Sequence, residues 1–198
     1  MHKNSKLIMS SNEFYNELKD VETSRESRLK YANMVLNDMS LLPKLIDIMF
    51  RIDDKVSYRA AWVFEFVCEN YIYAIVPYLD TFCNNIKNIH LDSAVRSIAK
   101  VCYFIAQEYD SKQPNTLKKM LKPKHREQII EVCFDWLIGK QKIAAKAYAM
   151  DTVFLLGKNY PWVHPQLTQI LEKDFQTQSA GYKVRARRIL KKLKSHEL

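Results

Sequence analysis

The chain has 198 residues, 47% of them hydrophobic and 27% charged, with a formal net charge of +9. This length favours one domain, spanning residues 1–198, with a sizeable core. Only 3 residues are glycine, against a usual share of about 7%. Gly139, Gly157 and Gly181 stand alone, so the sequence contains neither a Walker loop nor the glycine cluster of a dinucleotide-binding turn.

Residues that often ligate metals are scattered along the chain. The four cysteines (Cys68, Cys83, Cys102 and Cys133) lie in or beside apolar runs without a CxxC pair, which is typical of buried hydrophobic residues. No histidine has a second His or Cys three or four residues away. We therefore expect no metal site and no cofactor.

Membrane and export signals are also missing from the sequence. The apolar run Leu7–Met9 is too short for a signal peptide, and no stretch reaches 18 consecutive apolar residues. The prediction is a cytoplasmic protein that does not enter a membrane.

Residues 1–39 are predicted to form an N-terminal cap of two helices. Ser10 or Ser11 can cap a first short helix that runs to Asp20. The segment Thr23–Glu26 then reads as a capping box, which opens a helix that ends at 37–38.

The first clear helix pair follows the cap. The segment Leu41–Ile52 carries a broad apolar stripe and tolerates Pro43 in its first turn. Its partner, Ser57–Asn70, buries an apolar face on which Ala60 and Ala61 allow a neighbouring backbone to come close.

The second pair comprises Tyr71–Asn88 and Ala94–Tyr109, and Asp92 caps or begins the latter helix. Pro77 lies inside the first segment, so the helix either kinks there or begins there. The connector at 110–125 is basic and contains two prolines, and it predicts an insertion or an extra short helix.

Two further pairs complete the chain. The third pair is Arg126–Ile138 and Ile143–Lys158, with Gly139 predicted to end its first helix. The fourth pair begins after Pro161 and closes with the polar helix Tyr182–Leu193, as expected of an end repeat.

The second helix of each pair begins with a cation followed by a small residue. The four copies are Arg59-Ala60-Ala61, Arg96-Ser97-Ile98-Ala99, Lys146-Ala147-Tyr148-Ala149 and Arg185-Ala186, spaced by 37, 50 and 39 residues. A recurring period near 40 residues is typical of stacked helical hairpins.

These motifs resemble those of HEAT repeats. In the segments 54–61 and 92–99, an acidic residue precedes a helix that opens with a cation and small residues. The resemblance covers roughly residues 40–195, and the repeats are assigned to residues 40–198. It implies an all-α, right-handed superhelix of about four hairpins, in which second helices line a concave face and turn acids meet Arg59 and Arg96. The third and fourth repeats depart from the pattern, with Lys140-Gln141 and Gln178-Ser179 in place of the acid.

The candidate binding residues are basic side chains. They are Arg59, Arg96, Lys146, Arg185, Arg187, Arg188, Lys118, Lys119 and Lys122. One interpretation is structural, with cations satisfying carboxylates and helix ends. The other is a row of cations directed at an anionic partner. The basic segments Lys112–Arg126 and Lys183–Arg188 could contact the phosphates of nucleic acid.

Catalysis is a further hypothesis. Alkylpurine DNA glycosylases built from HEAT-like repeats use aromatic and acidic residues, and Trp62, Glu65, Trp136, Asp151 and Trp162 are of these types. No residue-by-residue match to that family's motif is found. The favoured interpretation is that the tryptophans are core and edge aromatics and that Glu65 and Asp151 form ordinary ion pairs. Short chains that look like this one are sometimes labelled adenylosuccinate lyase, but the Gly-Ser-Ser and Met-Pro-Lys strings of that family are absent from this sequence.

The sequence thus predicts a non-enzymatic scaffold or interaction module with a protein partner. The alternative is a nucleic-acid-binding protein, related to the alkylpurine DNA glycosylases.

Overall fold

A computed structural model describes residues 9–195 of the protein. All regular elements within this range are helical. The α-helices are α1 (Ser11–Leu18), α2 (Arg25–Asn37), α3 (Leu42–Met49), α4 (Ser57–Asn70), α5 (Leu79–Asn85), α6 (Asp92–Asp110), α7 (Thr116–Met120), α8 (Pro123–Ile138), α9 (Ile143–Leu156), α10 (Val163–Asp174) and α11 (Ala180–Lys194). The short 3-10 helices are η1 (Met39–Leu41), η2 (Ile72–Tyr78), η3 (Ile86–Asn88) and η4 (Gly157–Asn159).

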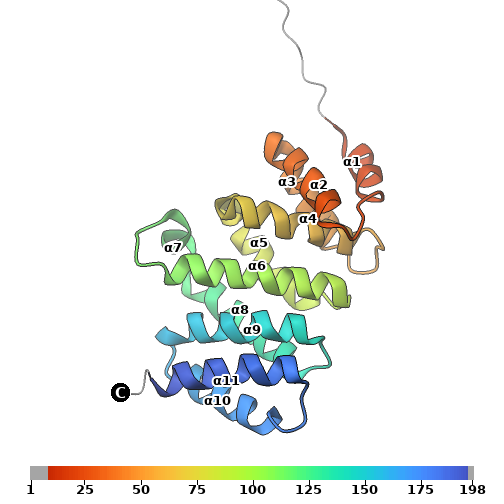
Figure 1. Cartoon of the computed structure of the whole chain (residues 1–198). Coiled ribbons are helices and arrows are strands. Elements are labelled where there is room, and N and C mark those ends of the chain that lie inside the picture. Colours follow the sequence, from red (N-terminus) through yellow and green to blue (C-terminus); the bar gives the residue numbers. More distant parts are fainter. Residues whose placement is uncertain (1–8, 196–198) are drawn as a thin grey trace, which may run out of the picture.

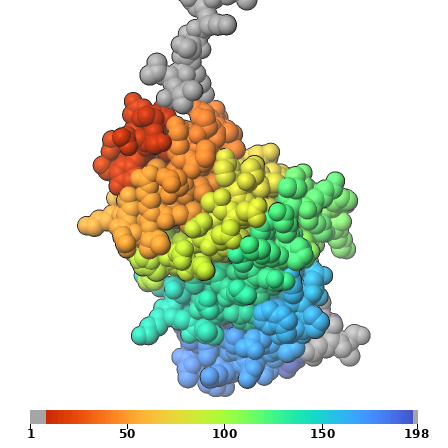
Figure 2. Space-filling view, turned by 180° about the vertical axis from the view of Figure 1, so that it is seen from behind, coloured from red at the N-terminus to blue at the C-terminus, as the bar shows by residue number. Residues whose placement is uncertain are grey.

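The helices form two layers. The second helices of the hairpins, α2, α4, α6, α9 and α11, pack side by side in this order, each against the next (Figure 1). The first helices α3, η2–α5, α8 and α10 form the other layer, in which α3, α8 and α10 pack against their own second helices α4, α9 and α11. In the second hairpin, η2 packs against α4 of the preceding hairpin and α5 against α8 of the following one. From behind, the colours follow one another in bands along the molecule (Figure 2). The helical hairpins therefore stack in a line, as the sequence predicts.

The two N-terminal helices continue this stack. Helix α1 contacts α3, and α2 contacts α4, which are the relations that later hairpins have to their neighbours. The capping box of this region differs from the predicted one. Ser24, and not Thr23, caps α2 by accepting the Ser27 N–H at 3.1 Å. The complete capping box lies at α1, where Ser10 and Glu13 each accept the other's backbone N–H.

Helix α4 has the predicted bounds and is buried on nearly every side, because it packs against α2, α3 and α6. Ala60 and Ala61 are fully buried and permit the close approach of neighbouring helices. Phe64 and Val67 fill the core beside them. A helix covered from three directions needs little polar surface, which explains its apolar sequence.

Pro77 changes the type of helix and produces no kink in a continuous α-helix. It lies within the 3-10 helix η2, and α-helical geometry begins at Leu79. This break places the proline, which has no N–H to donate, outside the interior of an α-helix.

The basic connector contains the predicted extra helix, α7. Asn115 caps it, with the side-chain oxygen accepting the Lys118 N–H at 2.7 Å. The new helix packs on α6 and η2, while α6 and α9 remain in direct contact. The insertion therefore lengthens one repeat without interrupting the stack of second helices.

The four cysteines are free thiols and all are buried, as predicted. Burial raises the pKa of Cys68 and Cys83, because a thiolate would be desolvated in the core. No helix of residues 9–195 is long and apolar enough to cross a membrane.

Candidate binding face

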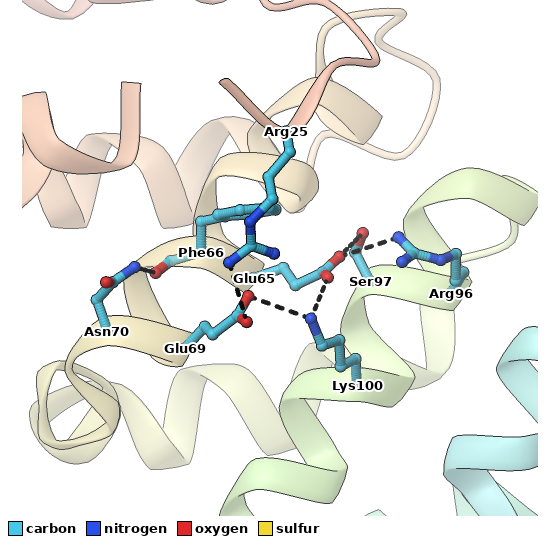
Figure 3. Close-up of polar contacts among 8 residues, drawn as sticks. All are labelled: Arg25, Glu65, Phe66, Glu69, Asn70, Arg96, Ser97 and Lys100. Carbon is cyan, nitrogen blue, oxygen red and sulfur yellow. Dashed lines mark hydrogen bonds and ion pairs between the residues drawn. The ribbon is translucent and has the colours of Figure 1, made fainter. Parts of the chain in front are cut away.

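The side chains that α2, α4, α6, α9 and α11 expose to solvent form a surface that we call the second-helix face. Its central feature is Glu65 on α4, only 1% exposed, which is surrounded by donors from α6 (Figure 3). The Ser97 hydroxyl donates at 2.6 Å, the Lys100 ammonium at 2.9 Å and the Arg96 guanidinium at 3.2 Å. One buried carboxylate thus fixes three α6 side chains.

A second carboxylate extends this network towards α2. Glu69, one turn after Glu65, contacts Lys100 at 3.2 Å and Arg25 at 3.5 Å. The Arg25 guanidinium also lies over the ring of Phe66, at 4.9 Å from its centroid. The chain of ion pairs therefore ties α2, α4 and α6 together.

The pKa of Lys100 reflects two opposed effects. Burial alone would lower it, but the hydrogen bonds and charges of Glu65 and Glu69 outweigh burial and raise it. Lys100 therefore stays charged, and its charge is balanced within the protein.

Arg28 on α2 joins this region through an aromatic ring. Its guanidinium lies 4.4 Å from the centroid of the Trp62 ring. Burial lowers the pKa of Arg28, against the opposing effect of the Glu65 charge. Its buried Nε has no hydrogen-bond partner in the part of the chain that the structure describes.

A matching cluster joins the last two second helices. The carboxylate of Asp151 on α9 accepts a hydrogen bond from the Arg185 guanidinium, with 2.6 Å between Nη1 and Oδ2. It also pairs with Arg188, and both arginines lie on α11. Asp151 is 5% exposed, whereas the two arginines reach solvent. The basic helix α11 is thus anchored by one buried acid.

An aromatic contact lies between these two charged clusters. Tyr103 on α6 packs against Tyr148 on α9 with ring centroids 5.9 Å apart. Burial, followed by the charge of Asp151, raises the pKa of Tyr103. At the other end of the same helix pair, Asp92 lies 3.4 Å from Lys142.

Three hollows lie along the second-helix face. The first, of about 700 Å³, lies between Trp62, Arg59 and the α1–α2 connector. The second, of about 530 Å³, lies where α4, α6 and α9 begin. The third, of about 420 Å³, lies between Tyr103, Asp151 and Arg188. The first two hollows share Tyr58.

The predicted pairing of turn acids with Arg59 and Arg96 is wrong. Arg96 pairs with the helix residue Glu65, and the Arg59 Nε donates to the Tyr58 hydroxyl at 3.3 Å. The turn acid Asp54 accepts the Tyr15 hydroxyl and the Val56 N–H. The acids that bind Arg96, Lys100, Arg185 and Arg188 lie within the second helices, because these pairs run across the contacts between successive second helices.

The other candidate residues occupy different surroundings. Lys146 is only 6% exposed. Arg187 lies over the Phe175 ring and lines a groove between α10 and α11. Lys118, Lys119 and Lys122 belong to α7 and its connector, where Lys118 donates to the Ser111 carbonyl and Lys122 lies 3.7 Å from Asp80. The structure thus brings Arg185 and Arg188 together and separates the rest.

The residues considered for catalysis have structural partners. Glu65 and Asp151 are the ion-paired acids described above, and Trp62 and Trp136 are buried. Trp162 is 52% exposed and packs near Phe134, at 5.8 Å between ring centroids. Residues 9–195 contain no group of three or more His, Cys, Asp or Glu that could hold a metal ion.

Sequence reasoning missed Lys100 and Glu69. Their signal was present as two matched spacings: acids at 65 and 69, and cations 31 residues later at 96 and 100. Because side chains four residues apart lie on one helical face, this double match predicts two neighbouring helices in register.

Comparison with known families agrees with this geometry. Residues 14–193 match the HEAT repeat domain family, and the chain belongs to that family. Neither the curated proteins nor the solved structures contained a match.

Proposed function

We propose that this protein is a non-enzymatic interaction module whose second-helix face binds a partner protein. The observation that carries the proposal is that the main basic side chains of this face are already paired within the protein. Arg96, Lys100, Arg185 and Arg188 are each paired with a buried carboxylate of the same chain. The face therefore offers fixed, separate charges and aromatic rings.

This arrangement favours a polypeptide over a phosphate backbone. Binding a nucleic-acid strand relies on many cations that exchange small counterions for phosphates. A cation that is already held by Glu65 or Asp151 has less charge to offer. Separate hollows suit individual side chains of a protein segment, and stacked repeats present such extended surfaces.

The proposal is tested by photo-crosslinking at two matched positions. Gln107 on α6 lines the third hollow, whereas Glu131 is exposed on α8 in the other layer. A crosslinking residue is placed at either position in the full chain, in cells that express the protein. We expect Gln107 to give one discrete polypeptide adduct that persists after nuclease treatment, and Glu131 to give none.

Two outcomes would contradict the proposal. Equal adducts from both positions would show that the second-helix face is not selective. Adducts at Gln107 that consist of nucleic acid and disappear with nuclease would favour the alternative function.

A further inference from the structure

The second hollow of the second-helix face has two kinds of lining. Its charged residues are Lys55, Arg96, Lys142 and Asp92. Its other residues are Tyr58, Leu91, Ser93 and Ala144, which contribute a phenol ring, aliphatic groups and a hydroxyl. The hollow therefore combines apolar surface with positive charge.

The positive charge of this hollow is only partly neutralised. Asp92 pairs with Lys142 at 3.4 Å, and Arg96 pairs with Glu65. Lys55 is exposed and has no ion-pair partner within residues 9–195. The unpaired Lys55, beside the partly exposed Arg96, leaves positive charge in this hollow that attracts a negative group.

The helix ends add to this field. The helices α4, α6 and α9 all begin at the hollow, and their N-cap residues Val56, Leu91 and Lys142 make no side-chain capping hydrogen bond. By contrast, Ser24 and Ser179 cap α2 and α11. Helix N-termini carry partial positive charge, so three of them reinforce the attraction of an anion.

We propose that this hollow receives an acidic segment of the partner protein, in which a carboxylate side chain lies beside a large apolar side chain. The carboxylate pairs with Lys55 and the outer edge of Arg96. The apolar side chain packs on Leu91, Ala144 and the Tyr58 ring. This inference rests on the proposed function and specifies the chemistry of the partner.

The hydroxyl groups suit the same occupant. The Tyr58 hydroxyl accepts a hydrogen bond from Arg59. Its own O–H remains able to donate a hydrogen bond to an acceptor on the bound segment. Ser93 supplies a second O–H at the start of α6. Two neutral donors beside a lysine match the several lone pairs of one carboxylate.

The test uses a library of short peptides with randomised central positions and the full chain immobilised on beads. We expect retained peptides to be enriched in Glu or Asp next to Leu, Ile or Phe. In the double variant Lys55→Glu with Lys142→Glu, we expect this enrichment to vanish and the affinity of a retained peptide to fall by about tenfold or more.

The matched control is Lys173→Glu, which reverses an exposed lysine on α10, outside the three hollows. It should leave the enrichment unchanged. Circular dichroism of all variants checks that the helices remain, which is expected because both substituted lysines of the hollow are exposed.

Three outcomes would overturn the inference. These are retained peptides without acidic and apolar pairs, no enrichment at all, or an enrichment that survives the double variant. If the Gln107 crosslink to a polypeptide persists in the double variant, the partner binds elsewhere on the face and only the inference fails. If labelled oligothymidine binds instead, and Lys119→Glu weakens it, both proposals fail.

Discussion

The ammonium of Lys100 on α6 lies 2.9 Å from a carboxylate oxygen of Glu65 on α4, across the contact between two successive second helices. Lys100 is 15% exposed, so this pair is shielded from solvent and from salt. The same ammonium reaches Glu69 at 3.2 Å. A single lysine therefore holds two turns of one helix against the next.

Replacing Glu65 should destabilise the fold strongly. Glu65→Gln removes the negative charge and leaves Arg96 and Lys100 without it, although both retain some contact with solvent. We expect the free energy of unfolding to fall by about 2 kcal/mol, less than for a wholly buried pair. Urea unfolding followed by circular dichroism measures this loss.

The matched control is Asp47→Asn, which removes a carboxylate paired with Arg51 at 2.6 Å on the surface. Exposed pairs of this spacing contribute little, so the change should stay below about 0.5 kcal/mol. Equal losses for both variants would contradict a special role for the buried carboxylate.

Two glycines should respond to alanine in opposite directions. A Cβ at Gly139 would lie 2.8 Å from the Asp135 carbonyl oxygen, whereas a Cβ at Gly181 would meet only Ile143 at 3.7 Å. Gly139→Ala should lower the free energy of unfolding by about 1 kcal/mol or more through strain. Gly181→Ala should raise it by about 0.5 kcal/mol, because alanine is the better helix former. Chemical unfolding of the two variants in parallel tests the sign of each change.

We expect the buried hydroxyl of Tyr182 to be dispensable for stability. The side chain is fully buried and its hydroxyl has no hydrogen-bond partner in the described part of the chain. Burial, assisted by the charge of Asp174, raises the pKa of Tyr182 to about 12. Because an unpaired buried polar group costs about 1 kcal/mol or more, Tyr182→Phe should leave the protein as stable or more stable in thermal melts. A clear loss of stability would show that the hydroxyl is paired.

Asp80 should contribute an acid-sensitive part of the stability. His125 Nδ1 accepts the Lys122 N–H, so its Nε2 carries the proton and donates to Asp80 at 2.8 Å. This hydrogen bond, with the charge of Lys122, lowers the pKa of Asp80 below its usual value of 3.8. Because the pKa of Asp80 is lower in the folded than in the unfolded state, its carboxylate stabilises the fold at pH values above the unfolded-state pKa. This stabilisation is lost as the pH falls through the folded-state pKa.

The measurement compares melting temperatures of the wild type and Asp80→Asn between neutral and acidic pH. We expect the wild type to be the more stable protein at neutral pH, and the gap to close below about pH 4. Asp53→Asn serves as the control, since Asp53 is exposed in the turn before α4. A gap that is independent of pH would contradict this assignment.

The positions of the helices could be predicted from the sequence better than the ion-pair partners of their charged side chains. The bounds of α4 follow from its own apolar pattern, and the extra helix α7 follows from prolines and a long interval. The type of helix around Pro77 was harder to predict, because the choice between α-helical and 3-10 geometry depends on local packing. The partners of Arg96 and Lys100 depend on the register between α4 and α6, which no single helix encodes.

The candidate binding face shows the same division. The sequence identified Arg185 and Arg188 but not the buried Asp151 as their common partner. Lys146 looked equivalent to Arg59 and Arg96, yet Lys146 itself is only 6% exposed. Residues at equivalent positions of successive repeats thus have different surroundings, because each second helix packs against different neighbouring helices.

The burial of Cys68, Cys83, Cys102 and Cys133 has a practical consequence for tracking this molecule. Maleimide dyes react with exposed thiolates, and the native sulfurs are screened from such reagents in the folded protein. A cysteine introduced at an exposed position such as Gln107 therefore becomes a unique attachment point, and the fluorescence of its dye can report when a partner arrives.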